Sequence, residues 1–216
     1  MSPPTNVVEL QRLAPAGLSL PRALWDDLAA AYESPAPRAY HSLVHVVAVA
    51  QHHAEVARVV GWRRPQDSYL AVLFHDAVYV AGANDNERRS AAMVQAAIDT
   101  YLTDGDVDAE RIASLIELTA RHGSFAASDV DDEAALFLDC DMAILGADAE
   151  VFDAYARAVR DEYREVPDDA YRAGRTTFLL RVLAAPAIFL SPYFSARLED
   201  LARENIAREL KVITRG

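Results

Sequence analysis

The sequence predicts an all-α fold, a bundle of about eight or nine helices. Apolar residues recur at intervals of three and four along almost the whole chain, which is the period of an α-helix. Runs that alternate apolar and polar residues between hairpin turns, the pattern of β-strands, are absent from the sequence. The 216 residues, 52% of them apolar, suffice for one large core. We therefore expect one helical domain over residues 19–216, after a loosely structured, proline-containing extension over residues 1–18.

Proline, glycine and polar N-cap residues set the helix boundaries in the first half of the chain. Pro21 and Pro65 each lie at the start of an expected helix, and Gly61 ends the helix between them. A polar loop over residues 81–86 precedes the next helix, and Asp85 or Asn86 is its expected N-cap. The expected helices cover residues 21–34, 40–60, 65–74 and 86–103, and a further one begins at Asp106 or Asp108 and ends near residue 122.

The second half of the chain shows the same helical period, and its helix boundaries are marked equally clearly by acidic residues, glycine and proline. An acidic stretch at residues 128–132 begins a helix that ends near Gly146, and Pro167 begins a later one. The expected helices cover residues 128–146, 149–166, 167–184 and 193–213. We find no internal repeat and no domain boundary in the sequence.

The net charge of −12 excludes several classes of function. An acidic surface repels the phosphate backbone, so we expect no long nucleic acid as a partner. No run of eighteen residues is free of charges and the N-terminus lacks the pattern of a signal peptide, so we expect no membrane partner and a cytoplasmic protein. The single cysteine, Cys140, lies among apolar and acidic residues and is expected to be a packed side chain rather than a nucleophile. The oligomeric state stays open.

Histidines and aspartates within the helical pattern predict a metal site. His41 and His45 lie four residues apart, so we expect both on one face of the 40–60 helix. An inward-facing pair of imidazoles needs a polar partner, and a cation would provide one. His75 and Asp76 are adjacent, so they can share one ion only where their helix ends. Mixed nitrogen and carboxylate ligands suit a divalent Mn, Fe, Ni, Co or Zn ion and do not distinguish among them.

Six segments in order carry a resemblance to a known family. The chain resembles the HD superfamily, and within it the family of predicted metal-dependent HD phosphohydrolases, whose fold is a helical bundle. The likeness covers about residues 22–190. It is carried by residues 38–45, 73–79, 85–87, 138–146, 160–163 and 174–175.

The resemblance implies a set of metal ligands, namely His45, His75, Asp76 and Asp141. The segment at residues 40–45 is also similar to that of cyclic-nucleotide phosphodiesterases, which implies that His41 is a general acid and His45 a ligand. A similar likeness favours Asp141 over Asp139, and two positions on a helix differ by about 200° of rotation, so only one should face the ion. The phosphodiesterase motif that follows the His-Asp pair is replaced here by residues 78–80, so cyclic-nucleotide specificity is not implied.

The implied reaction is hydrolysis of a small phosphate ester, with a nucleotide as one candidate, by attack of a metal-bound hydroxide. His41 would protonate the leaving oxygen. Glu87 would orient water or hold a second ion. Cationic side chains should meet the phosphoryl oxygens, and the candidates are Arg38, Arg160 and Arg175.

Each of these residues also has a structural alternative. His41 could position the substrate or bond to Asp76, and Glu87 could serve only as a carboxylate at a helix N-terminus. Arg160 and Arg175 could form surface ion pairs. Asp139 is expected to orient a histidine, His122 to serve a helix end or the site, and His52 and His53 to lie at the surface.

Two other functions remain open at this point. One is a non-enzymatic domain that binds a nucleotide or a partner protein and keeps the metal for structure. The other is an iron-dependent oxygenase on the same scaffold, which would need two further histidines between Asp76 and Asp141. Only His122 lies in that interval, so the phosphohydrolase is the favoured interpretation.

Overall fold

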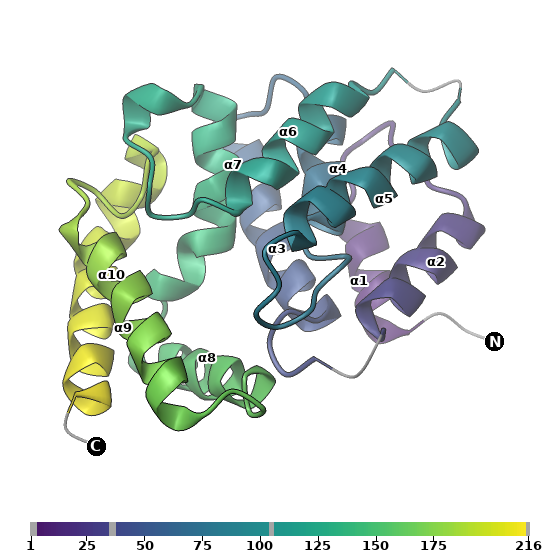
Figure 1. Cartoon of the computed structure of the whole chain (residues 1–216). Helices are drawn as coiled ribbons and strands as arrows, with labels where there is room; N and C mark the ends of the chain where they lie inside the picture. Colours follow the sequence, from purple (N-terminus) through teal and green to yellow (C-terminus); the bar gives the residue numbers. More distant parts are fainter. Residues whose placement is uncertain (1–3, 35–37, 104–105, 215–216) are drawn as a thin grey trace. The chain divides into compact units, whose positions relative to one another are not determined.

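The computed structural model describes residues 4–34, 38–103 and 106–214, and over these residues the protein is all-helical (Figure 1). Ten α-helices and two short 3₁₀ helices follow one another, with no strand among the described residues. The all-α prediction is confirmed. The helix expected over residues 21–34 ends at Tyr32, with Glu33 as its C-cap, and the prolines expected to follow it at residues 35–37 lie outside the described residues.

The helices form two compact units, residues 1–120 and 121–216. The first contains α1 (Thr5–Leu13), α2 (Arg22–Tyr32), α3 (Leu43–Val59), α4 (Pro65–Phe74), α5 (Asn86–Tyr101) and α6 (Ala109–Thr119). The second contains η1 (Ala127–Asp129), α7 (Asp132–Met142), η2 (Ala143–Gly146), α8 (Ala149–Glu162), α9 (Asp168–Ala184) and α10 (Pro192–Ile213).

Helix α1 lies in the segment that was expected to be loosely structured. Val7 and Leu10 are buried, and α1 packs against α3. The Tyr69 hydroxyl on α4 donates a hydrogen bond to the Leu10 carbonyl. The prolines that favoured an irregular extension lie outside α1, and Pro4 is its N-cap, a position where a missing N–H costs nothing. The prediction of a loose segment was therefore wrong for residues 5–13, and α1 is the additional helix.

Helix α4 is the centre of the first unit and packs against α3, α5 and α6 (Figure 1). Every residue from Asp67 to Phe74 is buried. The stretch from Tyr69 to Phe74 is apolar on all sides, as is typical of a core helix, and the helix is short because Pro65 fixes its start and the chain turns after Phe74. Its C-terminal end therefore brings the next two residues, His75 and Asp76, into the interior of the unit.

Gly146 marks the closest packing in the second unit. The 3₁₀ helix η2, which this residue ends, packs against α7, α8 and α10. A Cβ at Gly146 would lie 2.6 Å from Leu198 Cβ and 2.9 Å from the Leu198 carbonyl oxygen. Because part of that obstacle is backbone, the side chain of alanine has no space without a shift of α10.

Gly146→Ala should therefore lower the free energy of unfolding by about 1–3 kcal/mol, the usual cost of overpacking. Gly174→Ala is the matched control, because Gly174 lies within α9 and a Cβ there meets nothing within 4 Å. The control should stabilise the protein by about 0.5–1 kcal/mol through helix propensity. Urea unfolding of the two variants measures both effects, and equal changes would contradict the packing argument.

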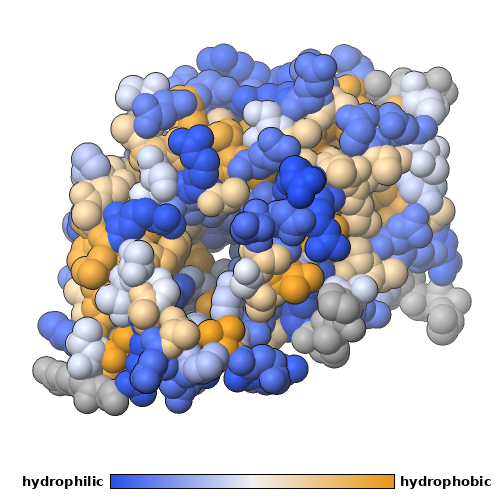
Figure 2. All heavy atoms as spheres, viewed as in Figure 1, coloured by the Kyte–Doolittle hydropathy of each residue, from blue (hydrophilic) through white to orange (hydrophobic). Residues whose placement is uncertain are grey.

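The surface is rich in hydrophilic side chains, as expected from the acidic composition. Figure 2 shows hydrophilic residues over much of the visible face, with hydrophobic residues scattered between them. None of the described helices combines the length and the apolar character needed to cross a bilayer.

Candidate metal centre

Three of the predicted ligands come together in the first unit. His45 lies on α3, His75 is the C-cap residue of α4, and Asp76 follows in the turn. His45 Nε2 lies 3.1 Å from His75 Nε2 and 3.5 Å from Asp76 Oδ2, and His75 Nε2 lies 3.2 Å from the same oxygen. All three side chains are largely buried. Among the described residues, they form the one group of three or more histidine, cysteine or acidic side chains that could hold a metal ion.

These separations fit a bound divalent ion. Ligands about 2.1 Å from one ion lie about 3.0–3.4 Å from one another, in octahedral and tetrahedral geometry respectively. The His75 ring also has a fixed orientation, because its Nδ1 donates to the Val72 carbonyl at 2.9 Å. A neutral His75 therefore directs its Nε2 lone pair toward His45 and Asp76, which is the arrangement of a metal-bound histidine.

The carboxylate of Asp76 lies in an unusual electrostatic environment. Burial alone would raise its pKa, but the facing imidazoles of His75, His41 and His45, in their protonated forms, hold the pKa below its ordinary value. Asp76 is thus ionised at neutral pH, and a charged oxygen is the form that binds a cation.

His41 lies beside this centre, though not on the helix where it was expected. Helix α3 begins at Leu43 with Ser42 as N-cap, so His41 lies in the preceding turn, and the prediction of one shared helical face was wrong. The rings of His41 and His45 are nevertheless close, with centroids 6.0 Å apart. The ring of Tyr79 stacks on His41 at 4.1 Å, an interaction that sequence analysis missed.

Arg38 connects the two segments that carry the centre. Its guanidinium donates to the His41 carbonyl, to the carbonyls of Asp76 and Ala77, and to carbonyls at the end of α2. Backbone on both sides of the histidine cluster is therefore held by one side chain. These contacts favour a positioning role for Arg38 over the expected contact with substrate.

The loop after Asp76 is held by the start of α5. Asn86 is buried, and its side chain bonds to both the N–H and the carbonyl of Val80. Ser90 makes the same pair of contacts with Val78. Glu87 is half-buried and lies one helical turn before the buried Ser90. Its predicted role in catalysis stays a prediction.

Asp141 belongs to the second unit. Its Oδ2 lies 2.7 Å from His122 Nε2, so the His122 ring has a carboxylate partner. The role of Asp141 as a fourth ligand stays a prediction. Its neighbour Asp139 was expected to orient a histidine, but it binds backbone instead. The Asp139 carboxylate accepts hydrogen bonds from Leu190 N and from the N–H and hydroxyl of Ser191, which precede α10.

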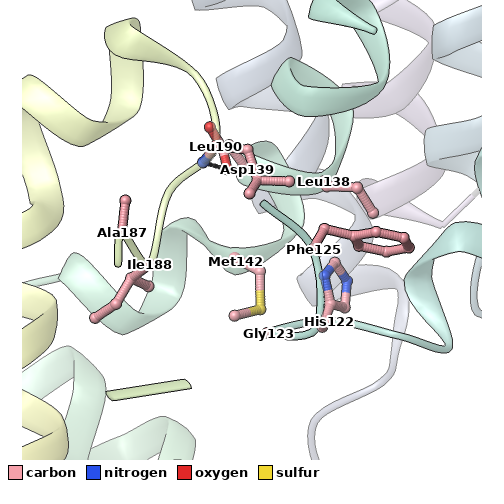
Figure 3. A pocket seen from close by; sticks show the side chains of 9 residues that line it. All are labelled: His122, Gly123, Phe125, Leu138, Asp139, Met142, Ala187, Ile188 and Leu190. Carbon is pink, nitrogen blue, oxygen red and sulfur yellow. Dashed lines mark hydrogen bonds between the residues drawn. The ribbon is translucent and has the colours of Figure 1, made fainter. Parts of the chain in front are cut away.

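A small cavity lies between His122, Asp139 and the 187–190 loop. Figure 3 shows His122, Phe125 and Met142 around it, with Asp139 bonded to Leu190. The cavity measures about 10 Å³, room for one water molecule and too small for a substrate. Burial raises the pKa of Asp139, the hydrogen bonds from Ser191 and Leu190 oppose the change, and the resulting value is about 6.

The two remaining predicted substrate ligands make contacts within the second unit. Arg160 donates to the carbonyls of Tyr163 and Val166 and to Asp168. Arg175 is 8% exposed and pairs with Glu209, so its ion pair is buried rather than at the surface. Both arrangements are structural, and the predicted contacts with phosphate stay predictions.

His53 was expected at the surface and is buried. It is 1% exposed, its Nε2 lies 2.9 Å from Ser68 Oγ, and its ring stacks on Trp62 at 4.6 Å. Its neighbour His52 is half-buried. Adjacent positions on a helix differ by about 100°, so only one of the two can face the core. Burial lowers the pKa of His53 to about 3.

His53 should therefore make stability depend on pH. Below about pH 6.5 the unfolded chain binds a proton that the folded chain rejects, so stability falls as the pH falls. Between pH 7.5 and pH 5, the free energy of unfolding should fall by about 2 kcal/mol. His53→Gln keeps a polar group opposite Ser68 and does not titrate, so it should remove this part of the pH dependence.

Urea unfolding at the two pH values tests this expectation, with His52→Gln as the matched control on the adjacent position. If both variants keep the wild-type dependence on pH, His53 is not the group responsible.

The prediction that His45, His75 and Asp76 converge is confirmed. The predicted site residues of the second unit, Asp141, Arg160 and Arg175, contact other side chains of that unit. Comparison of the chain with protein-family models, with curated proteins and with solved structures found no match.

Proposed function

We propose that the protein is a metal-dependent phosphohydrolase that cleaves a small phosphate ester at the centre formed by His45, His75 and Asp76. The observation that carries the proposal is the convergence of these three side chains at ligand-to-ligand distances. It is supported by the resemblance of the surrounding segments to metal-dependent HD phosphohydrolases. His45, His75 and Asp76 would hold a divalent ion, which would supply Lewis-acid chemistry for a phosphoryl oxygen and for a water molecule.

The residues around the centre supply positioning and proton transfer. In the protonated state, the His41 imidazole gives a proton to the leaving oxygen of the ester. Tyr79 keeps the plane of that imidazole fixed by stacking on it. Arg38 holds the backbone carbonyls of His41 and Asp76, and so maintains the distance between the proton donor and a ligand. Glu87 orients water at the start of α5.

Phosphoryl transfer depends mainly on charge neutralisation and positioning. The three candidate arginines already bond to carbonyls, carboxylates or a tyrosine of the chain, so an ion held by His45, His75 and Asp76 would have to neutralise most of the charge on the phosphoryl group. We include Asp141 as the fourth ligand on the resemblance alone.

Release of phosphate from a panel of phosphomonoesters and phosphodiesters tests the proposal. The protein is loaded in turn with Mn, Co, Ni, Zn or Fe, and compared with His75→Ala/Asp76→Ala. His52→Ala is the control, because it also removes an imidazole from α3. His52 is half-buried, next to the buried His53, and is not part of the cluster. We expect activity in the wild type and in the control, and none in the double variant. Equal phosphate release by wild type and double variant across the panel would refute the proposal.

A further inference from the structure

The first unit also contains a cavity, which is lined by residues outside the metal centre. It occupies about 170 Å³ between α2 and α5, two helices that run side by side on one edge of the unit (Figure 1). Leu24, Leu28 and Phe74 form its floor and are at most 1% exposed. Met93 and Ala97 on α5 form the opposite wall and are half-buried.

The size and the walls of this cavity suit a single aromatic ring. An apolar protein cavity of about 150 Å³ accepts a molecule the size of benzene. The side chains of Phe74 and Tyr101 offer aromatic contacts, and the Met93 thioether is a flexible and favourable neighbour for a ring. Ala96 and Ala97 leave the space that larger side chains at these positions would fill.

The rim of the cavity carries a negative charge. Asp27 is exposed on α2, and its Oδ2 accepts a hydrogen bond from the Tyr101 hydroxyl at 2.6 Å. A carboxylate has acceptor sites for several donors, so this bond leaves room for a second one. The net charge of −12 also attracts cations and repels carboxylates and phosphates.

We propose that this cavity binds a small primary amine with one aromatic ring, the ring against Phe74 and Met93 and the ammonium group at Asp27. The site is separate in its residues from the metal centre, and the proposal does not depend on the proposed hydrolase activity. Phe74 is the residue before His75, so an occupant would contact the last residue of the helix that holds a metal ligand.

The test uses 2-phenylethylamine and its neutral counterpart 2-phenylethanol, titrated into the full-length protein and followed by amide chemical shifts. We expect the amine to bind with a dissociation constant in the millimolar range, at least about threefold more tightly than the alcohol. The largest shifts should lie in residues 93–101. Absence of shifts there, or equal affinity for the two compounds, would overturn the proposal.

Two variants examine the walls and the charge separately. Ala97→Leu fills the cavity and should weaken amine binding about tenfold or more, whereas Ala92→Leu, an exposed position on the same helix that does not line the cavity, should leave it within twofold. Asp27→Asn lies at the surface and is not expected to disturb folding. It should remove the preference for the amine over the alcohol. Wild-type affinity in Ala97→Leu, or an unchanged preference in Asp27→Asn, would contradict the assignment.

Discussion

Asp76→Asn should weaken the binding of divalent metal ions by at least about 100-fold and abolish phosphate release. Loss of a residue that only supports a ligand typically costs ten- to hundredfold in affinity, and Asp76 is expected to be a ligand. Asparagine has nearly the same size but no charge, so the interior at the end of α4 keeps its packing. Isothermal titration with Mn or Zn, together with elemental analysis of the purified variant, measures the loss.

Asp99→Asn is the matched control, because Asp99 is an exposed aspartate on α5 that accepts a hydrogen bond from Gln95. It should bind metal as the wild type does. Unchanged metal affinity in Asp76→Asn would show that the cluster is a hydrogen-bonded group of histidines without an ion. His41→Ala distinguishes proton donation from metal binding. It removes the proposed proton donor, so phosphate release should fall while the metal stays bound.

Arg175→Leu should lower the free energy of unfolding by about 3–5 kcal/mol, because it leaves a buried carboxylate without its partner. Arg175 Nε and Nη2 lie 2.8 and 3.0 Å from the two oxygens of Glu209, and Nη1 donates to the Tyr155 hydroxyl at 3.0 Å. Burial alone would lower the pKa of Arg175, but Tyr155 and Glu209 raise it above its ordinary value. The guanidinium therefore remains charged inside the second unit.

The double variant Arg175→Leu/Glu209→Leu should recover much of the loss, because two apolar side chains can replace a buried ion pair at little cost. Arg181→Leu is the control, since Arg181 is exposed on the same helix and also lies over the Phe178 ring. It should change stability by no more than about 0.5 kcal/mol. Thermal and urea unfolding measure all three variants. Equal losses in Arg175→Leu and Arg181→Leu would mean that the Glu209 pair does not stabilise the protein.

The helices were predictable because their signals are local. Pro65 fixes the start of α4, and the adjacent pair His75 and Asp76 can share an ion only where a helix ends, which is where the structure ends it. Asp108 and Asp131 cap α6 and α7 by accepting from backbone N–H groups three residues ahead. Each of these features depends on residues within one turn of helix, so it can be read from the sequence.

The environments of individual polar side chains were harder to predict. His53 is buried and His52 is not, although both occur in the same local pattern. Asp139 binds backbone at Leu190 and Ser191, far away in the chain. No local periodicity distinguishes a carboxylate that holds a loop from one that orients a histidine, because the partner comes from a distant segment.

The sequence by itself determined the all-α architecture and most helix boundaries, and the resemblance of its motifs to a known family implied the meeting of His45 with His75 and Asp76. Only the tertiary structure decided that His41 lies before α3 against Tyr79, and that Arg38 and Arg175 bind the protein's own carbonyls and carboxylates. The physical reason is the range of the interactions. Helix formation is governed by neighbours three and four residues apart, whereas the hydrogen bonds of a buried polar group depend on which distant segments the packed core brings to it.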